Sequence, residues 1–321
     1  MALKPPPGLK LAQLKAVAFK CGIGSSGSKT VLAQRLIDEG RPVIGHGPTR
    51  ILSIDMGIRN LAYCLLDLPA RASKKKPGVI AWKRLNVSTT VSPTAPATVQ
   101  TSIGDETDVP MEKESFTPAA LSAAAYDLLR NQLIPLDPAY ILIERQRFRS
   151  MSSPHVLEWT IRINMFESIL YGVLCTLKGE GLWNGEVIPI TPMRVGPYWF
   201  PKDEVVEDAD DSQRLELRKV RKTANKKLLN KGRKIDLVRN WLENREMVDL
   251  MTNEAKATAK SYVDKWDGQR RKKATPLKDG EDNLAKLDDL ADSLLQGMAW
   301  IQWDEHKRIT TKYGALALLD K

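Results

Sequence analysis

Cysteine, histidine and long apolar runs are scarce in this sequence, and each scarcity excludes a class of protein. Only three cysteines and three histidines occur among 321 residues, and they lack the spacing of zinc ligands or of a disulfide framework. Scattered cysteines of odd number favour a reducing compartment. No run of about 18 apolar residues is present, so we expect no membrane-spanning helix. Hydrophobic residues make up 42% of the sequence, which suffices for a folded core.

Positive charge is what the sequence has in excess. Lys and Arg number 49 against 39 Asp and Glu, a net charge of +10, which favours a polyanionic partner such as nucleic acid. Residues 214–234 alone carry ten Lys or Arg and one acid. We interpret this stretch as an arm that binds DNA phosphates; a solvated charge run is the alternative. The DNA contacts expected from it are Lys226, Lys227, Lys231, Arg233 and Lys234.

The N-terminal stretch is basic and amphipathic, because no acidic residue precedes Asp38. Such a start is typical of an organelle transit peptide. The spacing of its apolar residues also predicts two short helices, at 8–20 and 29–38, around a Gly/Ser turn. A Gly- and Pro-rich segment, residues 41–49, follows as a linker.

The pattern LKLAQLKAVAFKCGIGSSGSKTVLAQRL within residues 8–40 resembles a SAP motif, a helix–turn–helix of DNA-associated proteins. We therefore expect residues 1–40 to form a SAP-like DNA-binding module. The resemblance implies phosphate contacts from Lys29 and Arg35. A helical hairpin packed on the main domain is the alternative interpretation.

Residues 50–321 are expected to form a mixed α/β domain. Strands are predicted at 50–57, 60–68, 78–88, 139–144 and 186–190, and helices at 118–133, 154–178, 231–247 and 283–303. A meander of three strands followed by helix-linked strands is the order of a ribonuclease H-like fold, a mixed sheet flanked by helices. Two long insertions, near 88–118 and 200–230, interrupt this order.

Four carboxylates stand where this fold would bring them together. Asp55 ends the first strand, and Glu144 ends the buried fourth strand. Asp289 and Asp292 share one face of the last helix, with Asp288 as an alternate ligand; a solvated face is the alternative for this helical pair. Clustered carboxylates repel one another unless a cation compensates. Oxygen ligands suit Mg²⁺, or Mn²⁺ in its place, and two such ions can cleave a phosphodiester.

Arginines occupy every second position after Glu144, namely Arg145, Arg147 and Arg149. If the strand continues, these side chains line one face beside the acids and could clamp DNA phosphates. Ordinary pairing with surface acids is the alternative.

Three motifs in order resemble the mitochondrial Holliday-junction resolvases of fungi, relatives of the bacterial RuvC resolvases. They are ILSIDMGIRNLAYCLLD, ILIERQRFRS and KLDDLADSLLQG. The resemblance implies a homodimer that nicks four-way DNA junctions in pairs, with Mg²⁺, during mitochondrial recombination. It matches Asp55 to the first-strand aspartate, Glu144 to the fourth-strand glutamate, and Asp289 with Asp292 to the helical acid pair.

Two other functions fit the same residues. A different RNase H-like nuclease, acting on RNA–DNA hybrids or on DNA ends, would use the same carboxylates. A non-catalytic DNA-binding protein would use only the N-terminal segment and the basic arm. For the first interpretation, two active sites in a two-fold dimer match the symmetry of a four-way junction. The predicted helix 154–178 is the candidate dimer surface, although it could simply cover the sheet.

Overall fold

The structure is a computed structural model that describes residues 8–73, 75–87, 115–146, 156–201, 225–272 and 280–319. Its strands are β1 (Thr49–Asp55), β2 (Leu61–Leu68), β3 (Gly78–Leu85), β4 (Tyr140–Glu144), β5 (Glu186–Ile190) and β6 (Asp249–Leu250). Its helices are α1 (Leu11–Lys20), α2 (Lys29–Glu39), α3 (Pro118–Asp127), α4 (Glu158–Gly179), α5 (Pro192–Trp199), α7 (Asn225–Asn244), α8 (Asn253–Lys272) and α9 (Gly280–Tyr313). A π-helical turn, η2 (Leu128–Leu133), and two 3₁₀ turns, η3 (Ile134–Leu136) and η4 (Ala315–Leu318), complete the described chain.

One six-stranded sheet organises the domain, with strand order β5-β4-β1-β2-β3-β6. β1, β2 and β3 form the antiparallel meander, while β4 runs parallel to β1 and β5 runs parallel to β4. The register places Ile54 opposite Ile143, so Asp55 and Glu144 leave the sheet side by side. The predicted ribonuclease H-like fold is therefore confirmed.

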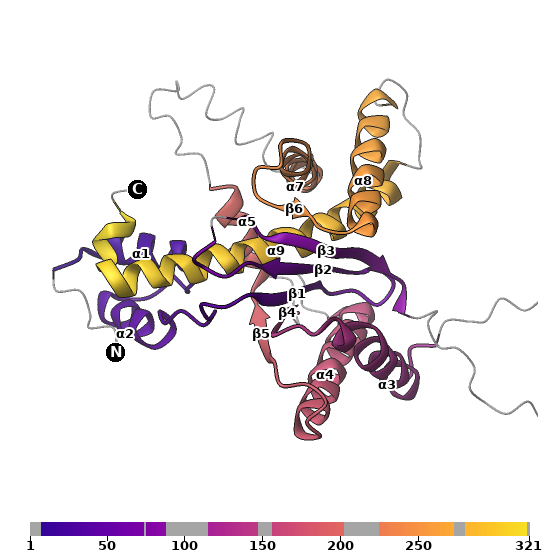
Figure 1. The fold of residues 1–321 in the computed structure, drawn as a ribbon, viewed down its shortest axis with the longest axis horizontal. Helices are drawn as coiled ribbons and strands as arrows, with labels where there is room; N and C mark the ends of the chain where they lie inside the picture. Colours follow the sequence, from indigo (N-terminus) through magenta and orange to yellow (C-terminus); the bar gives the residue numbers. More distant parts are fainter. Residues whose placement is uncertain are drawn as a thin grey trace, which may run out of the picture.

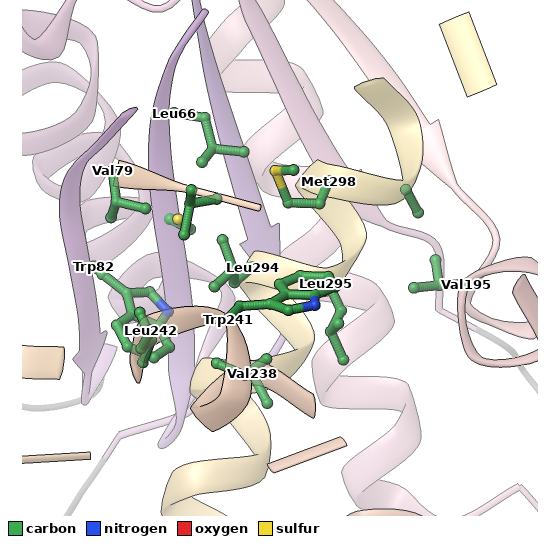
Figure 2. Packing of buried hydrophobic residues seen from close by; sticks show 14 of the residues in the cluster. Leu66, Val79, Trp82, Val195, Val238, Trp241, Leu242, Leu294, Leu295 and Met298 are labelled. Carbon is green, nitrogen blue, oxygen red and sulfur yellow. The ribbon is translucent and has the colours of Figure 1, made fainter. Parts of the chain in front are cut away.

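Helices cover both faces of the sheet (Figure 1). α3 and α4 pack on one face, over a core that includes Leu52, Ile54 and Phe166. α7, α8 and α9 cover the other face, where Figure 2 shows Trp82 of β3, Trp241 of α7 and Leu294 of α9 in one cluster. Burial of these side chains supplies the main driving force for placing the helices. No described helix is long and apolar enough to cross a membrane.

The first half of α9 lies unusually close to the sheet. A Cβ at Gly297 would come within 2.7 Å of the Leu66 side chain and 3.2 Å of the Ser53 Cβ. The neighbouring Gln296 donates to the Ser53 hydroxyl and to the Ile54 carbonyl, both at 3.1 Å. These two hydrogen bonds satisfy the buried amide of Gln296 and fix its position. The acids one to two turns earlier on α9 are consequently fixed over the end of β1.

The second half of α9 leads to a small third core, formed with the N-terminal helices (Figure 1). Leu14, Val17 and Leu32 of α1 and α2 pack there with Ala315 and Leu318 of η4. Gly22 has φ +67°, and a Cβ at this position would meet the Trp303 ring at 2.2 Å. The N-terminal and C-terminal segments therefore share one core, as the packed-hairpin interpretation expects. The SAP-like, DNA-binding interpretation of residues 1–40 and the linker at 41–49 stay predictions.

The structure departs from the predicted elements in several places. α4 begins at Glu158 rather than 154, and the long helix predicted at 118–133 finishes in the π-helical η2. The last helix extends on both sides of 283–303. Part of the 200–230 insertion is helical, because α7 already begins at Asn225. Residues 202–224 of that insertion, and the 88–118 insertion up to residue 114, lie outside the described residues.

Candidate metal-dependent active site

Asp55 and Glu144 form the part of the site that the sheet supplies. Each is the last residue of its strand, where the ladder ends and a side chain can turn toward solvent. The two carboxyl groups lie close enough to each other to interact. Burial raises the pKa of Asp55 well above its ordinary value, and the neighbouring Glu144 raises it further.

α9 supplies the other acids. Asp292 and Asp289 lie near enough to Asp55 for their charges to raise its pKa. Burial raises the pKa of Asp292 to about 7, against the opposing charge of Lys234 and with help from Asp288 and Glu144. Burial likewise raises the pKa of Asp289 to about 6, although Arg84 opposes the shift. Three elements distant in sequence thus bring Asp55, Glu144, Asp289 and Asp292 to one edge of the sheet.

Asp288 faces a different direction from its two neighbours. It is 6% exposed and lies 3.2 Å from the Lys231 ammonium and 3.6 Å from that of Lys234, both on α7. Asp289 instead pairs with Arg84 of β3 at 3.4 Å. Asp289 and Asp292 act on Asp55, and Asp292 also contacts Lys234. The Asp289–Asp292 pair as the helical ligands, with Asp288 as the alternate, stays a prediction.

The local charges do not balance. Five carboxyl groups meet three basic side chains at this edge. The acids are Asp55, Glu144, Asp288, Asp289 and Asp292, and the bases are Arg84, Lys231 and Lys234. With every group ionised, the acids exceed these bases by two negative charges. Burial is the main cause of the raised pKa values of Asp55 and Asp292, and the neighbouring carboxyl groups add to it.

The chain's own residues fit a hard divalent cation by chemistry. All the acidic donors are carboxylate oxygens, the ligands that Mg²⁺ and Mn²⁺ prefer. One buried oxygen of Asp288 and one of Asp289 accept no hydrogen bond from the described residues. Within that described part of the chain, however, no three His, Cys, Asp or Glu side chains already converge as a finished metal shell. Side chains at this edge would therefore have to turn to bind an ion.

Two residues on the α4 side of the site were not singled out from the sequence. Glu167 of α4 accepts the backbone N–H of Gln146 at 3.0 Å, which anchors the chain directly after Glu144. Burial raises the pKa of Glu167, and the nearby Glu144 adds to the shift while Gln146 and Arg145 oppose it. The Tyr171 hydroxyl, one turn later, is buried without a hydrogen-bond partner among the described residues. A glutamate in the middle of a long amphipathic helix gives no sequence signal of this contact.

Of the three arginines after Glu144 that were expected to bind DNA, the structure describes only Arg145. β4 ends at Glu144, and Arg145 is exposed while its backbone N–H donates to Ile190 at 2.8 Å. The strand thus stops where the prediction required it to continue for an alternating row. Arg147 and Arg149 lie outside the described residues.

The expected basic arm divides into residues that face the acids and residues that do not. Lys231 and Lys234 contact Asp288 and Asp292. Arg233 is exposed on α7 and lies over the Phe200 ring at 4.9 Å. Lys226 and Lys227 belong to the first turns of α7, and their side chains lie outside the described part.

The two DNA contacts expected from the N-terminal segment lie far from the acids in the fold. Lys29 is exposed at the start of α2. Arg35 donates to the carbonyls of Gly24 and Ser26, so its guanidinium holds the turn between α1 and α2. A role in binding phosphates stays a prediction for both residues.

Comparison with known proteins places these residues in a family. A curated relative from Saccharomyces cerevisiae, cruciform cutting endonuclease 1, mitochondrial, is 25% identical over 92% of this chain and 82% of its own length. A protein of the same name from Schizosaccharomyces pombe is 26% identical over 60% of this chain and 67% of its own length. The fold is similar to the crystal structure of the yeast mitochondrial Holliday junction resolvase Ydc2. The TM-score is 0.57 at 21% identity, covering 97% of this chain and 99% of that one.

The family model described as mitochondrial resolvase Ydc2 / RNA splicing MRS1 matches residues 51–309. The matched region contains the sheet except for the first two residues of β1, together with the acid cluster and nearly all of α9. Because the match covers most of the chain, this protein belongs to the Ydc2 / MRS1 family.

Proposed function

We propose that this protein is a structure-selective endonuclease that resolves four-way DNA junctions by paired nicks, using Mg²⁺, in mitochondrial DNA recombination. The observation that carries the proposal is the gathering of Asp55, Glu144 and Asp292 at one sheet edge with more negative charge than the nearby bases neutralise. The relatives named above as mitochondrial cruciform-cutting endonucleases support the substrate and the compartment.

The chain's own groups divide the work at this site. Asp55, Glu144, Asp289 and Asp292 would hold the divalent cations, two in number. When bound, such ions supply an activated water and stabilise the leaving oxygen. The turn after Asp55 is narrow, because a Cβ at Gly57 would lie 2.8 Å from the Asn60 carbonyl; this keeps the side-chain bulk low beside Asp55. The exposed Arg145 follows Glu144 directly and would orient a phosphate by charge-assisted hydrogen bonds.

A homodimer would place two such sites across a two-fold axis, in keeping with the symmetry of the junction. Two exposed apolar side chains favour α4 as the dimer contact. Leu157, just before the helix, is 69% exposed, and Ile161, within it, is 53% exposed. Large apolar side chains exposed next to one another are more common at interfaces than on free surfaces. The other face of α4 covers the sheet through Phe166 and Leu170, so the two roles weighed for this helix are compatible.

A second candidate function comes from the description of the family, which joins a resolvase with an RNA-splicing protein. A splicing role would require RNA binding but would not require clustered acids. The uncompensated carboxylates therefore favour the nuclease, whereas the run of positive charge at residues 214–234 suits either nucleic acid.

The decisive experiment compares substrates under identical conditions. End-labelled four-way junction, linear duplex, RNA–DNA hybrid and structured RNA are each incubated with the protein in Mg²⁺ or in EDTA. We expect nicks at symmetry-related positions of the junction only, and only with Mg²⁺. Equal cleavage of the hybrid would make the protein a general RNase H-like nuclease. Tight binding of every substrate without cleavage would indicate a non-catalytic nucleic-acid-binding protein.

A further inference from the structure

Lys234 occupies a position in the acid cluster that the proposed reaction does not explain. Its ammonium lies 2.7 Å from Asp292 and 3.6 Å from Asp288. Of the three basic residues at this edge, Lys231 pairs with Asp288 and Arg84 with Asp289, so Lys234 alone contacts Asp292. Asp292 in turn raises the pKa of Asp55, and Glu144 raises the pKa of Asp292. Lys234 therefore holds an oxygen of an expected metal ligand.

The backbone of Lys234 is fixed while its side chain keeps freedom. Ile235 and Val238, on the buried face of α7, are fully buried in the core against α9. The Lys234 side chain remains 24% exposed, so a route to solvent is open. A lysine carries its charge on a flexible four-carbon stem. The ammonium can thus leave Asp292 without any movement of α7.

The Lys234 ammonium contacts one of the two Asp292 oxygens, Oδ2. A divalent cation bound to the same carboxylate would lie a few ångströms from this ammonium, and like charges at that distance repel strongly where water is partly excluded. We propose that Lys234 is the internal counter-ion of the acid cluster, and that a divalent cation binding to Asp292 displaces its ammonium toward solvent. This proposal rests on the proposed function, because it assumes that Asp292 is a metal ligand.

The first test measures metal affinity through stability rather than through activity. The thermal unfolding midpoint of full-length wild type, Lys234→Met and the matched control Lys231→Met is followed during titration with Mg²⁺ or Ca²⁺, starting in EDTA. Both variants remove one positive charge from α7, but only the first frees Asp292. We expect the half-saturating metal concentration to fall about tenfold or more for Lys234→Met and to stay within about threefold for Lys231→Met.

The outcomes separate this proposal from the proposed function. If wild type binds metal and nicks junctions while Lys234→Met binds metal no more tightly, the counter-ion proposal alone is wrong. Weaker metal binding by Lys234→Met would overturn it in the same way, since Lys234 would then be arranging the ligands. If wild type neither binds metal nor nicks junctions, both proposals fail.

A second measurement uses wild type alone, so it does not depend on how a variant folds. Acetylation of Lys234 by an amine reagent is followed by peptide mass spectrometry with and without Ca²⁺. We expect the labelling rate of Lys234 to rise about threefold or more when metal is added, while that of the exposed Lys29 stays constant. An unchanged or slower rate for Lys234 would overturn the proposal.

Discussion

Two aspartates on α9 show how the same residue type serves two purposes along one helix. Asp292 and Asp304 are twelve residues apart, or about 18 Å at 1.5 Å per residue. Asp304 is 3% exposed and accepts the backbone N–H groups of Val43 and Ile44 at 2.5 and 3.1 Å. It also pairs with Arg71 at 2.9 Å and with Arg308 at 3.5 Å. Its charge is balanced by donors that fix the chain before β1.

Asp292 has the opposite kind of surroundings. One lysine contacts it, and the carboxyl groups of Asp288 and Glu144 raise its pKa. A buried charge with matched donors stabilises a fold, whereas a buried charge among like charges costs stability and is retained for function. The difference indicates that Asp292, in the first half of α9, serves the reaction, whereas Asp304, in the second half, stabilises the fold.

The largest expected effect comes from neutralising an acid of the cluster. Asp55→Asn should lower junction cleavage in Mg²⁺ by about 1,000-fold or more, because an amide cannot balance a divalent cation or its activated water. Junction binding should change by less than about threefold, since phosphate contacts dominate affinity. Single-turnover nicking and gel-shift titrations measure the two effects. Cleavage near the wild-type rate would show that the site is assigned wrongly.

The matching change at the other aspartate should act on stability. Asp304→Asn removes the charge that faces Arg71 and Arg308, and we expect the free energy of unfolding to fall by about 3 kcal/mol. Urea unfolding in EDTA measures this loss. Asp292→Asn, read in the same assay, should cost little or even stabilise the protein, because it relieves repulsion. The comparison between the two aspartates breaks down if both variants lose equal stability.

A smaller effect is expected where α9 approaches the sheet. Gly297→Ala places a methyl group 2.7 Å from the Leu66 side chain, so α9 or Leu66 must shift. We expect a loss of about 1–3 kcal/mol from overpacking. Cleavage by the folded fraction should also fall, because Asp292 lies on the same stretch of helix. Unchanged stability and activity would show that α9 is placed loosely.

The smallest expected effect is a slope of stability against pH. The pKa values of Asp292 and Asp289, about 7 and about 6, exceed the ordinary value of 3.8, so the folded protein binds these protons more tightly than the unfolded chain. Their contribution to stability is thus present below pH 4 and is lost as the pH rises toward 7. The loss is at most about 1.4 kcal/mol per pH unit for each proton.

Chemical unfolding between pH 4 and 7 in EDTA measures this slope. Asp292→Asn should flatten it, because the variant removes the proton that Asp292 binds more tightly in the folded protein. A stability that rises throughout this range in wild type, with no change in slope for Asp292→Asn, would contradict the raised pKa of Asp292.

Much of this fold follows from pattern, because β1, β2, β4 and α4 carry long apolar stretches bounded by turn residues. Two helices were missed for physical reasons. Among its described side chains, α8 buries only Ala255, Ala259, Tyr262 and Trp266, and the charged residues between them obscure the helical period of these apolar positions. α5 contains Pro192 and Pro197, which argue against a helix in sequence although the first stands at its permitted first turn.

The candidate site was predictable in its acids and unpredictable in its bases. Asp55 and Glu144 could be placed because both end apolar strands, and neighbouring parallel strands end at one edge. Lys234 belongs to a run of positive charge in the sequence, where each lysine looks equally solvated. Only the packing of α7 on α9 selects Lys234 and Lys231 to face acids and leaves Arg233 exposed. Such a contact between distant helices has no local signature.

The position of a bound metal tests the central claim most directly. Crystals of the protein soaked in Mn²⁺ are measured at a wavelength where manganese scatters anomalously. We expect an anomalous peak within ligand distance of Asp55 and Asp292, with the Lys234 ammonium displaced from Asp292. Manganese bound only elsewhere, with these two carboxylates holding no ion at saturating concentration, would contradict the account.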